Sequence, residues 1–215
     1  ANTEKYFKDD AGWEKAESLL RIAMEKRGVE FIEAKDEAAF YGPKIDIQMK
    51  NVNGKEDTAF TVQYDLSSPR KFNLVYIGED GQEHMAFVVH RSSIGSIERT
   101  MAFLIEKYAG AFPLWLSPVQ ARILPVSEKH HAYGNEVLEA LRNVGIRAEL
   151  DSASESLGKK IRNGKEEKIP YLLVVGDAEI EAKTVTPESR DAGKMEAMAV
   201  DAFVTKVKEE IIARA

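Results

Sequence analysis

Length, composition and charge already exclude several classes of protein. The chain has 215 residues, 44% hydrophobic and 31% charged, which is enough to bury a real core in one large domain or two small ones. It contains no cysteine, so disulfides, thiolate chemistry and cysteine-rich metal sites are excluded within it. A formal charge of −6 argues against a protein that coats nucleic acid through bulk electrostatics, so any RNA must bind on local basic patches.

Membrane and export signals are not evident in the sequence. No apolar run approaches the roughly 20 residues that cross a bilayer. The first residues lack the basic and apolar regions of a signal peptide. We therefore expect a soluble, cytoplasmic protein without a membrane partner.

The first half of the chain predicts one helix followed by an antiparallel sheet. Apolar residues at helical spacing between Asp9 and Gly28 indicate an amphipathic helix. Alternation of apolar and polar residues then predicts strands at 40–50, 57–66, 71–78 and 84–90. The Asn53-Gly54 turn between the first two strands is typical of a β-hairpin. A further helix is predicted from about Gly95 to Gly110.

The second half predicts a small open α/β sheet. The segment 111–120 has two prolines and no helical period, which makes it the best domain boundary. Beyond it, a β-α-β-α-β order with covered faces is expected. The predicted segments are strands at 121–126, 146–150 and 170–177, helices at 128–144, 157–164 and 198–212, and a ribbon at 179–190.

The stretch AFVVHRSSIGSIER (86–99) is the most informative in the sequence. It runs from a predicted strand through a glycine-containing turn into the start of a helix. Free N–H groups at a helix start attract anions, and Arg99 in the first turn adds a planar, permanently charged donor. This combination suits a nucleotide phosphate. The alternative is a solvated surface pair formed by Glu98 and Arg99.

This stretch resembles motif 3 of the class II aminoacyl-tRNA synthetases, and in detail that of the threonyl-tRNA synthetases. The resemblance implies that Arg99 binds ATP and that Ser96 lines the same pocket. His90 matches the third ligand of the zinc ion with which these enzymes hold threonine. The other two family ligands lie upstream of this chain, so the zinc site is expected to be incomplete here. The alternative for His90 is a strand-end histidine bonded to a neighbour.

The segment FYGPKIDI (40–47) is a second match to the same family. By resemblance Tyr41 contacts threonine and Lys44 reaches into the active site, while Thr61 lies near the nucleotide and Gln63 points toward the substrate carboxylate. Because side chains alternate faces in a strand, Lys44, Thr61 and Gln63 are independently expected on one polar face. Such a face is otherwise usually solvent-exposed sheet. Thr58 departs from the family's glutamine, which contacts the nucleotide.

The segment LGKKIRNGKEEKIPYLLVVGDAEIE (157–181) resembles the anticodon-binding domain shared by the threonine, proline, histidine and glycine enzymes. A positive patch for tRNA phosphates is expected from its basic residues, which are Lys159, Lys160, Arg162, Lys165 and Lys168. The alternative is a solvated helix face. By resemblance Glu179 reads an anticodon base. Three positions depart from the family, Ser154, Ser156 and Glu188. Arg190 lies close to the last of these and is also expected to contact tRNA.

The neighbouring histidines His130 and His131 point about 100° apart on a helix, so they do not form a metal pair and are expected on the surface.

Together these features predict an α+β unit followed by an α/β unit. The predicted parts are the antiparallel-sheet half of a class II catalytic domain (1–113, with motif 3 at 86–99), a linker (114–120) and a complete anticodon-binding domain (121–215). The resemblance implies a C-terminal portion of an enzyme that activates threonine with ATP and Mg²⁺ and charges tRNA, as a homodimer at full length.

Segments like motif 1, motif 2 and an editing domain are missing from the sequence, so we expect the chain alone to be inactive. A free-standing, non-catalytic tRNA-binding or regulatory module stays open as an alternative. Another class II synthetase of the same subgroup is a third possibility.

Overall fold

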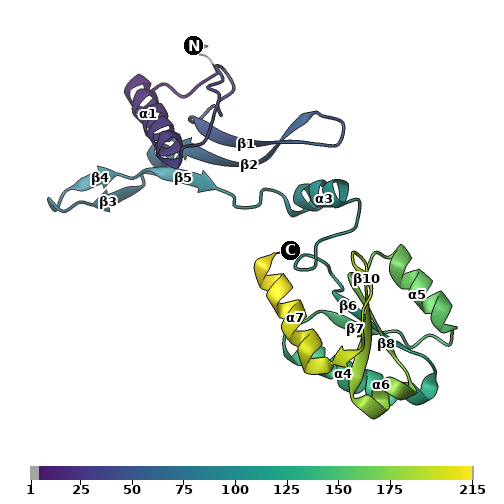
Figure 1. Cartoon of the computed structure of the whole chain (residues 1–215). Helices are drawn as coiled ribbons and strands as arrows, with labels where there is room; N and C mark the ends of the chain where they lie inside the picture. The colour runs from purple at the N-terminus through teal and green to yellow at the C-terminus, as the bar shows by residue number, and fades with distance from the viewer. Residues whose placement is uncertain (1–4, 215) are drawn as a thin grey trace. The chain divides into compact units, whose positions relative to one another are not determined.

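The computed structural model describes residues 5–214 and divides into two compact units, Ala1–Phe103 and Leu104–Ala215 (Figure 1). Helix α3 (Ile97–Tyr108) begins in the first unit and ends in the second. Within residues 5–214, no helix is both long enough and apolar enough to cross a membrane.

The first unit consists of helix α1 (Asp10–Arg27) and a three-stranded antiparallel sheet in the order β1-β2-β5. Its strands are β1 (Lys44–Lys50), β2 (Glu56–Asp65) and β5 (Val88–Arg91). Asp9 begins α1 by accepting the Gly12 N–H at 3.1 Å, and Gly28 ends it in the left-handed conformation with φ 63°. The sequence therefore sets both helix ends through local capping.

Three details of this unit differ from the predicted strands. The predicted strand 84–90 is divided between two sheets, because Glu83–Met85 pairs with Val75–Ile77 whereas Val88–Arg91 pairs with β2. The segment 71–78 is not one strand: a short helix α2 (Ser68–Lys71), with Pro69 in its first turn, precedes a two-stranded ribbon of β3 (Val75–Ile77) and β4 (Glu83–Met85). The β1–β2 register also shifts after Ile47, which leaves Ala59 as an extra residue of β2. This bulge places Thr58 opposite Gln48, to which it is hydrogen-bonded at 2.9 Å.

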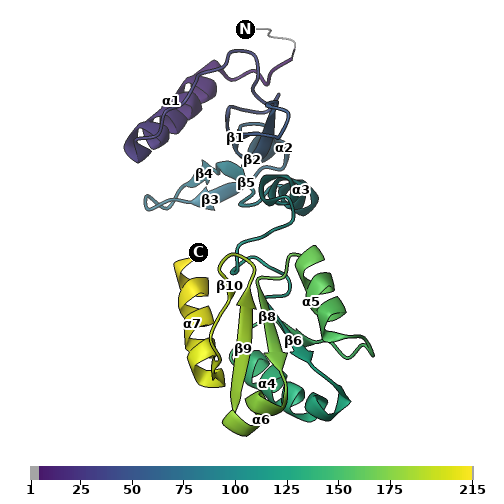
Figure 2. The ribbon, with the colours of Figure 1, turned by 45° about the vertical axis from the view of Figure 1, so that its right-hand side comes forward.

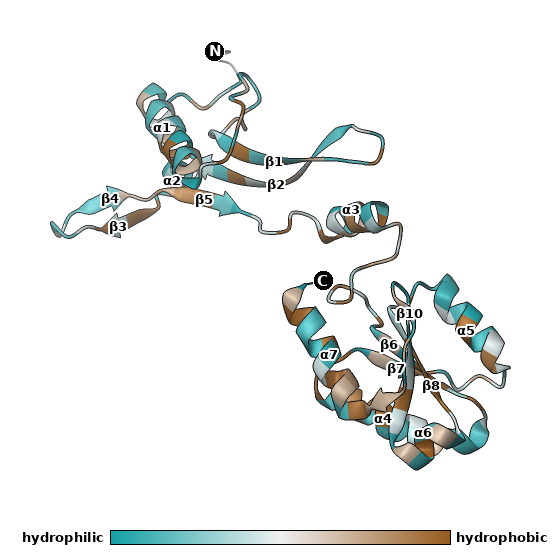
Figure 3. Ribbon diagram, in the orientation of Figure 1, coloured by the Kyte–Doolittle hydropathy of each residue, from teal (hydrophilic) through white to brown (hydrophobic). Residues whose placement is uncertain are grey.

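The first unit buries little apolar surface. Its core is a small cluster of Ala16, Tyr64 and Leu66, packed against Phe7 and Trp13. Figure 3 shows apolar residues along β3 and β5, and several large apolar side chains there are exposed: Phe72, Tyr76, Ile77, Phe87 and Val89. Exposed apolar groups of this number are typical of interaction surfaces.

The second unit is a mixed six-stranded sheet in the order β10-β9-β8-β6-β7, with β11 paired to β9. The strands are β6 (Ala121–Pro125), β7 (Ala148–Leu150), β8 (Tyr171–Val175), β9 (Thr184–Ser189), β10 (Gly193–Lys194) and β11 (Met198–Ala199). Strands β6, β7 and β8 run parallel, whereas β9 is antiparallel to β8. The expected antiparallel sheet followed by an α/β unit is confirmed.

Helices cover both faces of this sheet (Figure 2). They are α4 (His131–Asn143), preceded by the short η1 (Glu128–His130), and α5 (Leu157–Glu166), α6 (Asp177–Ala182) and α7 (Val200–Ala213). Ile123 and Leu173, both 0% exposed, pack with α4 and α7, whereas Leu124 and Leu172 pack with α5 on the other face. Alternation along the buried strands therefore builds two cores.

The segment before β6 is packed into the second unit by its main chain. Leu114 is 5% exposed and belongs to the larger core. The Gln120 side-chain amide donates to the Leu114 carbonyl at 2.9 Å. Arg147 donates to the carbonyls of Trp115 at 2.8 Å and Ser117 at 2.9 Å. These bonds satisfy carbonyls that no regular element pairs.

Part of the predicted ribbon at 179–190 is helical, because α6 occupies its first residues before β9 begins. The carboxylate of Glu179 accepts the Gly176 N–H at 2.8 Å and the Thr186 hydroxyl at 2.6 Å. Glu179 therefore fixes the start of α6 and links it to β9.

We expect Gly164→Ala and Gly158→Ala, both on α5, to have opposite effects on stability. A Cβ at Gly164 would lie 2.5 Å from the buried Leu172 side chain, whereas one at Gly158 meets nothing within 4 Å. Gly164→Ala should cost about 1–3 kcal/mol through overpacking. Gly158→Ala should be neutral or stabilising by up to about 1 kcal/mol. Urea unfolding followed by Trp115 fluorescence, with Trp13 replaced by phenylalanine, measures both; equal costs would contradict the close packing of α5.

Glu179 should make the second unit sensitive to acid. Burial alone raises the pKa of Glu179, but the bonds from Thr186 and Gly176 outweigh it and hold that pKa below its ordinary value. The stabilisation is therefore present at neutral pH and is lost as the pH falls below about 4.3, the unfolded-state value. Glu179→Gln should cost about 1 kcal/mol at pH 7, and the difference should shrink in acid.

The control for this experiment is Glu181→Gln, an exposed residue on the same helix. It should stay within about 0.5 kcal/mol of the parent chain at every pH. A Glu179→Gln cost that grows as the pH falls would contradict the assignment.

Candidate functional sites

The polar face of the first sheet brings four of the predicted residues together. Lys44 on β1 is opposite Gln63 on β2, and Gln63 is opposite His90 on β5, so the three side chains form a row across the strands. The Tyr41 hydroxyl donates to the Gln63 side-chain carbonyl. The Tyr41 ring lies edge-on to the His90 imidazole, with ring centroids 5.9 Å apart. The face predicted by alternation is present.

The segment holding Tyr41 is fixed to the end of β2 by main-chain bonds. Leu66 N–H donates to the Tyr41 carbonyl at 2.8 Å, and Tyr64 N–H donates to the Pro43 carbonyl at 2.9 Å. A Cβ at Gly42 would lie only 1.8 Å from the Tyr64 carbonyl oxygen. Only glycine permits this approach, so the YGP pattern positions the Tyr41 side chain over Gln63.

Two carboxylates on the same face were not singled out by the sequence analysis. Asp46 forms an ion pair with Lys44, and its other oxygen is buried without a hydrogen-bond partner among residues 5–214. Asp65 is 3% exposed and receives a bond from His90 Nε2 at 2.8 Å. The alternation that places Lys44 and Gln63 on this face also places both aspartates there. The same pattern in the sequence could therefore have predicted their position.

Asp65 is held as a carboxylate by its surroundings. Burial alone would raise the pKa of Asp65, but bonds from His90 and from the amides of Ser67 and Ser68, each 2.9 Å long, lower it to about 2. The strand-end alternative for His90, a bond to a neighbour, thus describes its Nε2. Its Nδ1 makes no hydrogen bond to the residues that the structure describes.

A single histidine cannot hold zinc, and among the described residues no group of three or more His, Asp or Glu side chains is placed to bind a metal ion. The donor set therefore fits zinc only as one ligand of a larger set. The carboxylate behind His90 is the partner that metal-bound imidazoles ordinarily have.

Arg99 lies at the start of α3, beside the bulge in β2. Ser96 begins the helix by accepting the Arg99 N–H at 3.2 Å, and the guanidinium donates to the Thr58 carbonyl at 2.7 Å. Glu98 is bonded to the Ser96 hydroxyl at 2.9 Å. Glu98 and Arg99 are both exposed, as the surface alternative expects, but in this described segment they bond to other groups and not to each other. Thr61 is opposite Asp46, one step along the same face.

The basic helix of the second unit presents a smaller patch than predicted. Lys159 is paired with Glu155 at 2.6 Å and Lys165 with Glu188 at 2.5 Å, while Arg162 is exposed. Placing Lys160 in an exposed patch was wrong, because it is 2% exposed and faces the interior. Helical spacing predicts which residues share a face, but the packing of the helix against the rest of the unit decides which face is exposed to solvent.

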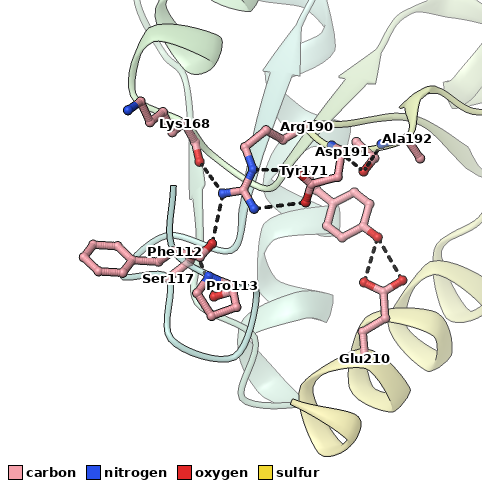
Figure 4. A network of polar contacts seen from close by, with 10 residues as sticks. Phe112, Pro113, Ser117, Lys168, Tyr171, Arg190, Asp191, Ala192 and Glu210 are labelled. Atoms are coloured by element: carbon pink, nitrogen blue, oxygen red, sulfur yellow. Dashed lines mark hydrogen bonds and ion pairs between the residues drawn. The ribbon is translucent and has the colours of Figure 1, made fainter. Parts of the chain in front are cut away.

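Arg190 is engaged within the second unit (Figure 4). Its Nη1 donates to the carbonyls of Phe112 at 2.9 Å and Lys168 at 3.1 Å, and its other nitrogens bind Asp191. Lys168 in turn donates to the Ala109 carbonyl. These two predicted tRNA contacts therefore hold the segment that follows α3.

The expectation of a surface His130 was also wrong. His130 is 2% exposed, its Nδ1 accepts the Ser127 N–H at 3.0 Å, and its Nε2 lies 3.1 Å from Asp177. Its neighbour His131 is only half-buried, so adjacent histidines have different environments. His130 thus links Ser127, in the turn after β6, to Asp177, which follows β8. Helical spacing alone does not predict these contacts.

Comparison with known proteins identifies both units. The family described as "tRNA synthetase class II core domain (G, H, P, S and T)" matches residues 6–108, and the "Anticodon binding domain" family matches residues 120–210. The chain is 49% identical to a threonine–tRNA ligase of Clostridium perfringens over 213 residues, 99% of this chain and 33% of that protein. It is 48% identical to the ligase of Listeria welshimeri over 211 residues, with 98% and 33% covered.

A solved structure agrees with the sequence comparisons. The crystal structure of the RNA binding domain of threonyl-tRNA synthetase from Cryptosporidium parvum is similar, with a TM-score of 0.86 and 32% identity, covering 96% of this chain and 52% of that one. The chain spans about one third of the length of the curated relatives it matches. With a class II core segment and an anticodon-binding domain in one chain, this protein belongs to the threonyl-tRNA synthetase family of class II aminoacyl-tRNA synthetases.

Proposed function

We propose that this chain is part of a cytoplasmic threonine–tRNA ligase that activates threonine with ATP and charges the cognate tRNA. It supplies one wall of the active site and the tRNA anticodon-binding domain. The observation that carries the proposal is the row of Lys44, Gln63 and His90 under Tyr41, on a polar face within the segment matched by the class II core family.

The chemistry of this wall is positioning and charge stabilisation. Tyr41 and Gln63 offer a hydroxyl and an amide, already hydrogen-bonded to each other, that suit the polar groups of an amino acid. Arg99 and Ser96 at the start of α3 suit ATP phosphates accompanied by Mg²⁺, with Thr61 beside them. Lys44 is the one lysine in this row, and its positive charge, paired with Asp46, suits a negatively charged group of a substrate.

Zinc in the full enzyme would bind both the hydroxyl and the amino group of threonine. Valine has the amino group but no hydroxyl, so it would make only one of these two bonds. His90 would be one ligand, through the Nδ1 that Asp65 leaves available. The remaining ligands, the homodimer contacts and the other wall are proposed to come from parts that this chain does not hold.

The second unit is proposed to bind tRNA through the exposed face of α5, where Lys159, Arg162 and Lys165 lie. Their positive charge suits phosphate groups. Direct base contacts by Glu179 and Arg190 are not included, because their polar atoms are engaged within the unit.

Arg162→Ala should weaken tRNA binding and reduce its salt dependence. The purified chain should bind a threonine-accepting tRNA with an affinity that falls as salt rises. Loss of one phosphate contact should lower the slope of log affinity against log salt by about 1. Lys208→Ala, exposed on α7, is the control. Fluorescence anisotropy measures both, and identical slopes for the two variants would contradict the assignment to α5.

The same binding assay tests anticodon recognition. A tRNA of identical body with an altered anticodon loop should bind at least about tenfold more weakly, because single-stranded bases are recognised on their edges. Equal affinity for the two tRNAs would contradict an anticodon-reading role and leave only backbone binding.

The 215 residues alone should not catalyse threonine-dependent exchange of pyrophosphate with ATP. The expected zinc ligand on the polar face is His90, and a single histidine cannot hold the zinc ion that is proposed to bind threonine. Exchange above background, measured with purified chain, threonine, ATP and Zn²⁺, would overturn this prediction.

A further inference from the structure

Lys160 is the one buried lysine among residues 5–214, with 2% of its surface exposed. Removing an ammonium group from water is costly unless polar groups surround it. Lys160 belongs neither to the proposed active-site wall nor to the proposed tRNA-binding face of α5. Its ammonium group points away from that exposed face. A charge kept inside a small unit at this cost indicates a specific task.

The ammonium lies at the carboxyl ends of two neighbouring parallel strands. Its Nζ donates to the carbonyl of Pro125, the last residue of β6, at 3.3 Å. It also donates to the carbonyl of Asp151, which directly follows β7, at 3.2 Å, and lies 3.9 Å from the Asp151 carboxylate. Three groups at the ends of two strands therefore surround one positive charge.

These contacts join two connecting segments. Pro125 leads into the turn that holds Ser127 and His130, and Asp151 begins the loop 151–156 that leads into α5. The main chain also ties the start of the loop to β6, because the Asp151 N–H donates to the Ile123 carbonyl at 2.9 Å. The other bonds of the loop are within itself and to α5; the Asp151 carboxylate, for example, accepts the Ala153 N–H at 3.0 Å. Lys160 is thus the side-chain link between the loop and the neighbouring strand.

Lys160 therefore holds the carboxyl ends of β6 and β7 together at the point where the chain enters the loop 151–156. The loop 151–156 also sets the position of the first turn of α5, and Glu155 in it binds Lys159 and Asn163 of that helix. Displacing the loop would therefore displace the exposed basic face.

We propose that Lys160 is a positioning residue for tRNA binding: it holds the turn after β6 and the loop 151–156 in the arrangement that binds RNA, without touching phosphate. The inference rests on the proposed binding of tRNA by this unit. The basic helix α5 then has two roles. Arg162 and its exposed neighbours bind the phosphates of the ligand, whereas Lys160 bonds to groups of the protein itself.

The salt dependence of tRNA binding distinguishes the two roles. Lys160→Met keeps the length of the side chain and removes its charge. It should weaken the affinity about tenfold, as expected for lost bonds from a charged group. It should leave the slope of log affinity against log salt, from about 50 to 300 mM, equal to that of the parent chain, because no phosphate contact is lost. Arg162→Ala, in contrast, should lower that slope.

A second variant covers the case in which Lys160→Met fails to fold. Asp151→Asn keeps the acceptor for the Ala153 N–H and removes the negative charge facing Lys160. It should weaken the affinity about threefold, again with an unchanged slope. Circular dichroism and melting curves confirm that each tested variant is folded.

Lysine footprinting tests the same inference in the parent chain. With an amine-reactive acetylating reagent, Lys160 should stay unmodified with and without tRNA, whereas exposed Lys159 should react and be protected by tRNA.

Three results would overturn the inference: a folded Lys160→Met variant with parent affinity, a slope lowered as in Arg162→Ala, or a Lys160 that reacts freely and is protected by tRNA. Absence of tRNA binding by the parent chain would overturn the proposed function as well, so the two failures are distinguishable.

Discussion

Strand β2 is the constraint on which the candidate active-site wall depends. It pairs with β1 and β5 at once, so its register aligns Lys44, Gln63 and His90 and brings Asp65 under the imidazole. Because side chains alternate along a strand, a shift by one residue would turn this whole set to the apolar face. The bulge at Ala59 changes the register only beyond the row, where Arg99 meets the Thr58 carbonyl.

The two units differ in how they are stabilised. The second buries alternate residues of β6 and β8 on both faces of a sheet, and it binds the carbonyls of the preceding segment with arginine, lysine and glutamine side chains. The first packs a small cluster around Ala16 and exposes many apolar groups. The second unit therefore resembles a self-sufficient domain, whereas the first has a small core and the exposed apolar groups that are typical of an interaction surface.

Charged side chains in the second unit serve the protein more often than the sequence suggested. Lys160, Lys168 and Arg190 donate to main-chain carbonyls, and Glu179 accepts from a helix start. Fixed charges that satisfy carbonyls and amides at element ends hold connecting segments in place. Among the basic residues of α5, Lys159, Arg162 and Lys165 are exposed, which is the local positive surface that an acidic chain would need to bind a polyanion.

The sequence by itself determined the family, the fold class and the polar face of the first sheet, because these follow from local motifs and from the two-residue period of strands. Tertiary structure decided the rest. It buried Lys160 and His130, gave Arg190 main-chain partners and made Asp65 the partner of His90. Burial and hydrogen-bond partners depend on which segments pack together, and a single sequence read along the chain does not contain that information.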